Sequence, residues 1–122
     1  MNSFKKSLAP PNSIIFVVDP SGQYELPPDP GSALVTTTAS CIGVGTLAEM
    51  DGETTVNLSE TFVTPKGNLA FDGKLETPSL QIAVIDSEGN SVLTMPVKNK
   101  VTSVKIWVND SNEPNDIFVQ AK

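Results

Sequence analysis

Carboxylates are the residues of this chain best suited to chemistry. The 122-residue sequence has 14 acidic and 8 basic residues, for a formal net charge of −6, and all the basic residues are lysines because it has neither histidine nor arginine. Without histidine the chain has no imidazole base, no histidine-dependent catalytic triad and no histidine metal ligand. Any acid–base or metal chemistry therefore falls to carboxylates.

Two acidic loops are the best candidates for a metal site, because Ca²⁺ prefers oxygen ligands. The candidate ligands in these loops are Asp86, Glu88, Asp110, Glu113 and Asp116. Neither loop has the ligand spacing of an EF-hand. We favour the simpler interpretation that Asp, Asn and Gly form turns and keep the loop tips in water. We therefore expect no cofactor, with Ca²⁺ as the alternative.

Enzymatic chemistry has little support in the sequence. A carboxylate pair of the glycosidase type needs two groups about 5–10 Å apart in a cleft. The chain contains no phosphate-binding glycine loop, no nucleophile elbow and no zinc-peptidase motif. The single cysteine, Cys41, has no cationic neighbour in the sequence to lower its pKa, so we expect a buried structural thiol. We predict that the protein is not an enzyme.

The composition also argues against nucleic-acid and membrane partners. Arginine, the main reader of guanine and phosphate, is missing, and a net negative charge opposes binding to a phosphate backbone. No apolar run approaches the roughly 18 residues of a membrane span, and the first residues lack the apolar region of a secretory signal. We expect a cytoplasmic protein whose partner is another protein.

The single tryptophan is the candidate for contact with that partner. Two strand-like segments, 101–108 and 116–121, can pair around the polar loop that joins them. Trp107 then lies opposite Phe118 on one face, next to Lys105, and such an aromatic pair is typical of an interface hot spot. If a second layer covers that face, both rings belong to the core, and the sequence leaves this question open.

The strongest structural signal is the segment 80–97, in which two apolar runs flank a polar turn. It predicts a β-hairpin that pairs Ile82 with Met95 and Val84 with Leu93 on one apolar face. This hairpin should lie near the middle of a sheet, against a core. By the same alternation, the hairpin 101–121 places Ile106, Val104 and Val108 on its core face.

Other segments predict shorter strands. Residues 12–19 are apolar on both faces, which indicates an inner strand or one covered on both sides. Residues 34–47 predict two strands, or one strand bent near Gly43 or Gly45, since glycine inside a strand marks a bend or a close approach of another backbone. A ligand near these glycines is the less ordinary interpretation.

Two Asp-Gly pairs, at 51–52 and 72–73, predict the turns of further hairpins. A short strand is predicted at 61–64. The residues from 1 to 12 carry two adjacent prolines near their end and no apolar pattern, so we expect a loose N-terminal arm followed by a domain at 13–122.

No segment has the apolar spacing of a helix. Roughly seven to nine short strands with frequent turns predict an all-β fold, a single-domain antiparallel β-sandwich. An immunoglobulin-like or C2-like topology fits within this class, and a small barrel is the alternative.

The sequence therefore predicts a small acidic protein-interaction or accessory module that is not an enzyme. An inhibitor or immunity-type partner of a cationic protein is one form it could take, since opposite charge steers association. Two alternatives stay open. One is a Ca²⁺-binding sandwich that uses the acidic loops, and the other is a structural subunit that forms homo-oligomers through sheet edges or the Trp107 face.

Overall fold

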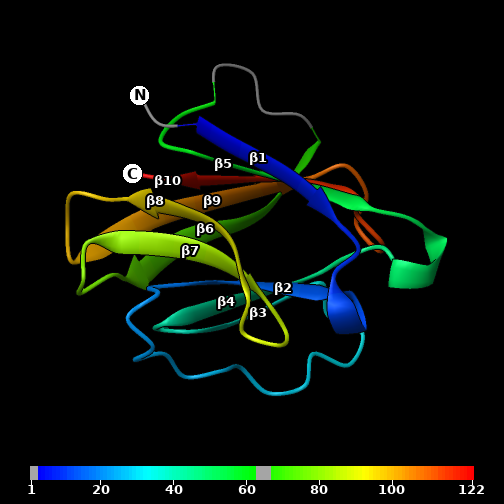
Figure 1. The fold of residues 1–122 in the computed structure, drawn as a ribbon, viewed down its shortest axis with the longest axis horizontal. Helices are drawn as coiled ribbons and strands as arrows, with labels where there is room; N and C mark the ends of the chain where they lie inside the picture. Colours follow the sequence, from blue (N-terminus) through cyan, green and yellow to red (C-terminus); the bar gives the residue numbers. More distant parts are fainter. Residues whose placement is uncertain (1–2, 63–66) are drawn as a thin grey trace.

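The computed structural model describes residues 3–62 and 67–122 as two β-sheets packed face to face (Figure 1). The strands of the described residues are β1 Ser3–Leu8, β2 Ile14–Val18, β3 Val35–Thr38, β4 Cys41–Gly45, β5 Thr54–Ser59, β6 Asn68–Glu76, β7 Gln81–Asp86, β8 Ser91–Pro96, β9 Val101–Val108 and β10 Asp116–Ala121. Two short 3-10 helices, η1 Pro11–Ser13 and η2 Glu49–Asp51, lie in the connections. None of the described helices is long or apolar enough to cross a membrane.

Sheet I has the strand order β1-β5-β10-β9-β6, and sheet II has the order β3-β4-β2-β7-β8. Neighbouring strands are antiparallel except β5 and β10, which run parallel. The predicted all-β antiparallel sandwich is therefore confirmed. The described strands form two open sheets rather than the alternative small barrel.

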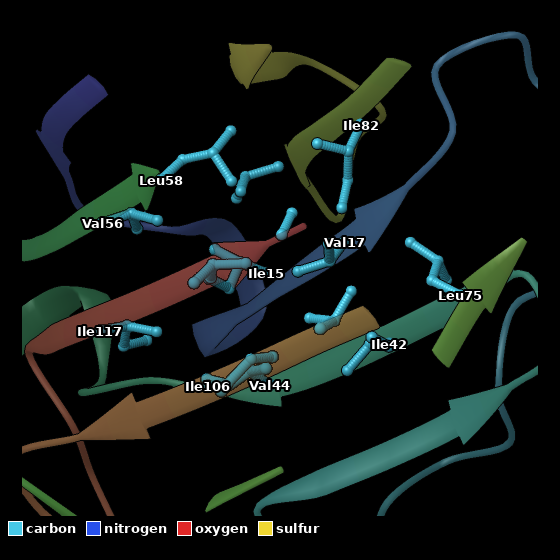
Figure 2. Packing of buried hydrophobic residues seen from close by; sticks show 14 of the residues in the cluster. Ile15, Val17, Ile42, Val44, Val56, Leu58, Leu75, Ile82, Ile106 and Ile117 are labelled. Atoms are coloured by element: carbon cyan, nitrogen blue, oxygen red, sulfur yellow. The ribbon is translucent and has the colours of Figure 1, made fainter. Parts of the chain in front are cut away.

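The core lies between the two sheets and is built from alternate residues of both. Ile15 and Val44 of sheet II face Ile106 and Ile117 of sheet I, and none of these side chains is exposed (Figure 2). Because successive residues of a strand point to opposite faces, every second position enters this core. Each such side chain contributes roughly 1.5–3 kcal/mol relative to leaving it in water.

The two hairpins predicted from the sequence are confirmed in register. In β7–β8, Ile82 pairs with Met95 and Val84 with Leu93, and a bulge follows at Ile85. Of the two strands, β7 is an inner strand, whereas β8 forms an edge of sheet II. In β9–β10, the core-facing residues include the predicted pairs of Ile106 with Val119 and Val108 with Ile117.

Strand β2 is an inner strand with apolar residues on both faces, as predicted. On the outer face of sheet II, a second cluster contains Val18, Cys41, Ala83 and Ile85, and Tyr24 packs against it from the β2–β3 connection. Burial raises the pKa of the Cys41 thiol to about 12. The thiol is therefore a structural side chain, as expected.

The predicted N-terminal arm is wrong over the described residues. Residues 3–8 form β1, which pairs with β5 from Ser3 opposite Ser59 to Leu8 opposite Thr54. The strand lies at the edge of sheet I, so most of its side chains are exposed and it carries none of the apolar alternation of an inner strand. Lysines on an edge strand also oppose pairing with another chain.

The two Asp-Gly turns were also wrong. The pair at 51–52 lies in the connection between β4 and β5, which belong to different sheets. The pair at 72–73 lies inside β6, where a Cβ on Gly73 would come within 2.7 Å of the Phe71 ring. Glycine at 73 thus makes room for an aromatic side chain.

Of the strand predicted at 61–64, residues 63 and 64 lie outside the described residues, and 61–62 are not strand.

Buried polar side chains fix the connections at the end that contains the β6–β7 turn. The Asp19 carboxylate is 4% exposed and accepts hydrogen bonds from the backbone N–H groups of Ser21 (2.8 Å) and Ser79 (2.7 Å) and from the Ser79 hydroxyl. The Thr77 hydroxyl, fully buried, donates to the carbonyl of Asn99 at 2.7 Å and lies 2.7 Å from the Thr102 hydroxyl.

Candidate functional site

One row of side chains crosses the outer face of sheet I. Backbone pairing places Leu69, Trp107, Phe118, Asn57 and Lys5 next to one another on five neighbouring strands. The opposition of Trp107 and Phe118, on the face away from the core, is the one predicted from the sequence. Both rings are half-buried, whereas Leu69 is 52% exposed.

A ring that the sequence analysis missed covers part of this row. Phe62 lies edge-on to Trp107, with ring centroids 6.4 Å apart, and edge-on to Phe118 at 5.2 Å. Its backbone N–H donates to Gln120 Oε1 at 3.3 Å, which fixes the segment above β10. We call Phe62, Trp107 and Phe118 the aromatic cluster. Because Phe62 lies outside any strand, no period in the sequence could have linked it to Trp107.

The polar side of the row is fixed by hydrogen bonds. Asn57 Nδ2 donates to Asp116 Oδ1 at 3.0 Å and to the carbonyl of Ile117 at 3.1 Å. Asn57 and Asp116 line a shallow depression together with Lys5 and Phe118. Lys105, the third predicted contact residue, is exposed one row away, between Gln120 and Asp72. Asp116, a candidate calcium ligand, therefore serves as the acceptor for an asparagine.

The other candidate calcium ligands form turns. Asp86 Oδ1 accepts the backbone N–H groups of Glu88 and Asn90, both at 2.9 Å. Burial alone would raise the pKa of Asp86, but the hydrogen bonds from Asn90 and Glu88 outweigh it and lower that pKa. Asp110 Oδ1 accepts from Asn112 at 2.8 Å and from Glu113 at 3.0 Å, and these bonds lower its pKa.

The carboxylates of the two loops do not gather into a metal site. Within residues 3–62 and 67–122, no group of three carboxylate or thiol side chains could hold an ion together. Glu88 and Glu113 are exposed, and Asp86 and Asp110 accept hydrogen bonds from their own turns. Turn formation accounts for both loops.

The acidic residues do gather at one end of the sandwich, which we call the acidic end. Its described segments are 9–13, 27–33, 46–53, 87–90 and 109–115. Direct hydrogen bonds hold its segments together: the Thr46 N–H donates to the Ser13 carbonyl, the Leu47 N–H to the Pro114 carbonyl, and Asn12 Nδ2 to Ser87 Oγ, each at 2.9 Å. Residues 27–33 line a pocket together with residues 12–14 and 112.

Among the residues that the structure describes, the acidic end carries negative charge only. Its exposed carboxylates are Asp29, Glu49, Asp51, Glu53, Glu88, Asp110 and Glu113. Its segments contain no lysine. The lysines of the described residues lie on sheet I or at the other end, where the β8–β9 connection and the C-terminus are found (Figure 1). Met50, between two of these carboxylates, is 94% exposed. The molecule therefore has a marked separation of charge along the sandwich.

No protein-family model matches the chain, and no curated protein matches it significantly. Two solved structures are similar in fold. ComJ from Bacillus subtilis, described as an inhibitor of the DNA-degrading activity of NucA, aligns with a TM-score of 0.73 at 8% identity, over 98% of this chain and 96% of that one. The product of crocagin biosynthetic gene J aligns with a TM-score of 0.60 at 11% identity, over the same shares. At these identities the likeness shows the fold alone.

Proposed function

We propose that this protein is a non-enzymatic module of the inhibitor or immunity type that binds a cationic protein through its acidic end. The observation that carries the proposal is the separation of charge. Seven exposed carboxylates surround one end of the sandwich, and the described segments that form it contain no lysine. A surface of one sign attracts a partner of the opposite sign and repels others.

The similar fold of ComJ supports this proposal. ComJ inhibits an activity that degrades DNA. An enzyme of that kind must bind a polyanion, and proteins do so with clusters of lysine and arginine. An acidic protein of the same fold has the charge to cover such a cluster.

The exposed Met50 gives the acidic end an apolar contact as well. Methionine side chains are flexible and adapt to irregular surfaces, and buried apolar anchors surrounded by polar groups are typical of interface hot spots. Met50 is flanked by Glu49 and Asp51, so its burial by a partner would bring both carboxylates to the rim of the contact. Charge would then steer the approach, and the thioether would be desolvated at the centre.

The test begins with capture of the partner from the host by the tagged protein and continues with the purified pair. Binding is measured by calorimetry in about 0.1 M and about 1 M NaCl, between which the Debye length falls from about 10 Å to about 3 Å. The dissociation constant should rise by at least about tenfold. A partner that binds equally well in both salts would contradict the proposal.

Charge variants locate the surface. The double variant Glu49→Gln, Asp51→Asn removes two exposed charges from the acidic end and should reduce the association rate by about tenfold. The matched control is Asp72→Asn, Glu76→Gln, which removes two exposed charges from β6. If the control weakens binding as much as the test variant, the acidic end is not the contact surface.

A second candidate function is self-association through the aromatic cluster. Leu69 is 52% exposed next to Trp107, and Val101 of β9 is 51% exposed, so sheet I offers apolar surface to a second copy. Light scattering across a wide concentration range tests this. A monomer at every concentration would exclude it, and a dimer that Leu69→Ser dissociates would support it.

A further inference from the structure

Strand β4 has no side chains on the outer face of its second half. Gly43 lies between Thr36 of β3 and Phe16 of β2, and Gly45 lies opposite Ile14. Because alternate residues of a strand share a face, both glycines point away from the core. The Phe16 ring and the Thr36 hydroxyl fill the space above Gly43, each 3.2 Å from the position of a Cβ, whereas nothing lies closer than 3.7 Å to that position at Gly45. The outer face of sheet II is therefore hollow at Gly45. The two strands predicted within 34–47 are confirmed as β3 and β4, joined by a turn at 39–40, so the alternative of one strand bent at these glycines is wrong.

The segment 27–33 and this hollow together line a partly open pocket of about 730 Å³. The pocket is lined by Phe16, Thr36 and Gly45 from the sheet and by Asn112 from the β9–β10 loop. Three of the seven residues of the segment are prolines, whose fixed φ angles stiffen it. The backbone N–H of Gly31 donates to Asp29 Oδ1 at 2.9 Å, which fixes the turn further. We call this pocket the glycine groove.

The walls of the glycine groove combine an apolar surface with acceptors. The Phe16 ring and the prolines supply the apolar part, and Asp29 supplies an exposed carboxylate. Thr36 Oγ1 is buried without a hydrogen-bond partner in the described residues. Such a hydroxyl is an unfavourable feature that an incoming donor would relieve. No lysine lines the groove, and the loop of Asn112 also carries Asp110 and Glu113.

We propose that the glycine groove receives an arginine side chain of the cationic partner, an inference that rests on the proposed function. Arginine has an apolar stem for the proline wall, and its planar guanidinium stacks on an aromatic ring such as Phe16. Its fixed set of N–H donors suits the carboxylate of Asp29 and the hydroxyl of Thr36. The bare backbone at Gly45 leaves the depth that so long a side chain requires.

The first test uses a small probe and needs no partner. Nα-acetyl-arginine amide is titrated into ¹⁵N-labelled protein in low salt, and amide shifts are followed by NMR. We expect saturable shifts at Thr36, Gly45 and Asn112, with a dissociation constant on the order of 1–10 mM. The matched control is Nα-acetyl-citrulline amide, the uncharged isostere, which should bind at least about tenfold more weakly. No saturable shift at these amides, or equal binding of citrulline, would overturn the inference.

Two variants test the groove itself. In Gly45→Val the new Cβ would lie 3.7 Å from Leu34, an ordinary contact, and the side chain would fill the groove. In Asp29→Asn the amide oxygen can still accept from Gly31 while the charge is lost. Both should abolish the arginine shifts, whereas Asp72→Asn on β6 should leave them unchanged. Circular dichroism and the melting temperature confirm folding, and a folded Asp29→Asn that binds arginine as well as the parent would contradict the inference.

The partner complex separates this inference from the proposed function. If Glu49→Gln, Asp51→Asn weakens the complex while Gly45→Val leaves it unchanged, the proposed function stands and the glycine groove is not the contact. If the arginine probe binds as described and no cationic partner forms a salt-sensitive complex, the groove stands as an arginine site and the proposed function fails.

Discussion

Replacing Phe62 with alanine tests the structure of the aromatic cluster. The Phe62 ring makes edge-to-face contacts with Trp107 and Phe118, with interplanar angles of 87° and 89°. Each such contact contributes about 0.5–1.5 kcal/mol beyond burial. Burial of about half of the ring adds about 1 kcal/mol, and the ordering of the side chain offsets a similar amount. Phe62→Ala should therefore lower the free energy of unfolding by about 2 kcal/mol.

Trp107 is the only tryptophan, so its fluorescence reports both on the cluster and on unfolding. In urea titrations the midpoint of Phe62→Ala should fall by about 1 M, given slopes of about 1–3 kcal/mol/M for small proteins. In the folded state, removal of the covering ring should shift the Trp107 emission to longer wavelength and increase its quenching by acrylamide.

The matched control is Phe4→Ala on the edge strand β1. Phe4 is 39% exposed and pairs with Leu58, on the core side of sheet I and away from Trp107. Its loss should reduce stability to some extent and leave the folded-state emission of Trp107 unchanged. If Phe62→Ala has the emission and quenching of the parent, Phe62 does not cover Trp107 and the description of the cluster is refuted.

Further predictions concern buried polar groups. Thr77→Val should lower the free energy of unfolding by about 1–3 kcal/mol, because it leaves the Asn99 carbonyl and the Thr102 hydroxyl without their partner. Thr54→Val should be neutral or stabilising, since Thr54 Oγ1 is buried without a partner in the described residues. Urea unfolding of the two variants tests this difference. Burial would raise the pKa of Asp19, but hydrogen bonds from Ser79 and Ser21 outweigh burial and lower that pKa. The Asp19 carboxylate therefore stabilises the folded state fully above its unfolded-state pKa, and this contribution is lost as the pH falls through the folded-state pKa. Asp19→Asn should therefore reduce stability at neutral pH and flatten the acid limb of a pH–stability curve. Cys41, with its pKa raised to about 12, should react with a disulfide reagent at pH 8 only at the rate of unfolding, and a rapid reaction of the native protein would contradict its burial.

The features that the sequence predicted correctly are local ones. The hairpins β7–β8 and β9–β10 join strands adjacent in the chain, so apolar alternation and one turn determine their registers. The opposition of Trp107 and Phe118 followed from the second register. The wrong predictions concern residues whose structural role differs from the one typical of their type. Gly73 makes room for Phe71 instead of forming a turn, and β1 is polar because it lies at an edge.

The candidate sites were harder to predict because they join distant segments. Phe62 reaches Trp107 from a loop, and residues 27–33 reach Gly45 across sheet II. No periodic pattern connects such segments in the sequence. The acidic end was visible only as a set of acidic loops, since their common position depends on which strand ends meet at one side of the sandwich.

The parallel pairing of β5 with β10 has a consequence for how the protein is made. β10 lies in the middle of sheet I, yet it is the last of the described strands in the chain. During synthesis β1 and β5 emerge early, and β5 presents an unpaired edge until residues 116–121 leave the ribosome. Such an edge can pair with other chains, and contacts between distant segments form slowly. Sheet I is thus completed only at the last step, so any shortening of the chain that removes β10 would separate β1–β5 from β9–β6.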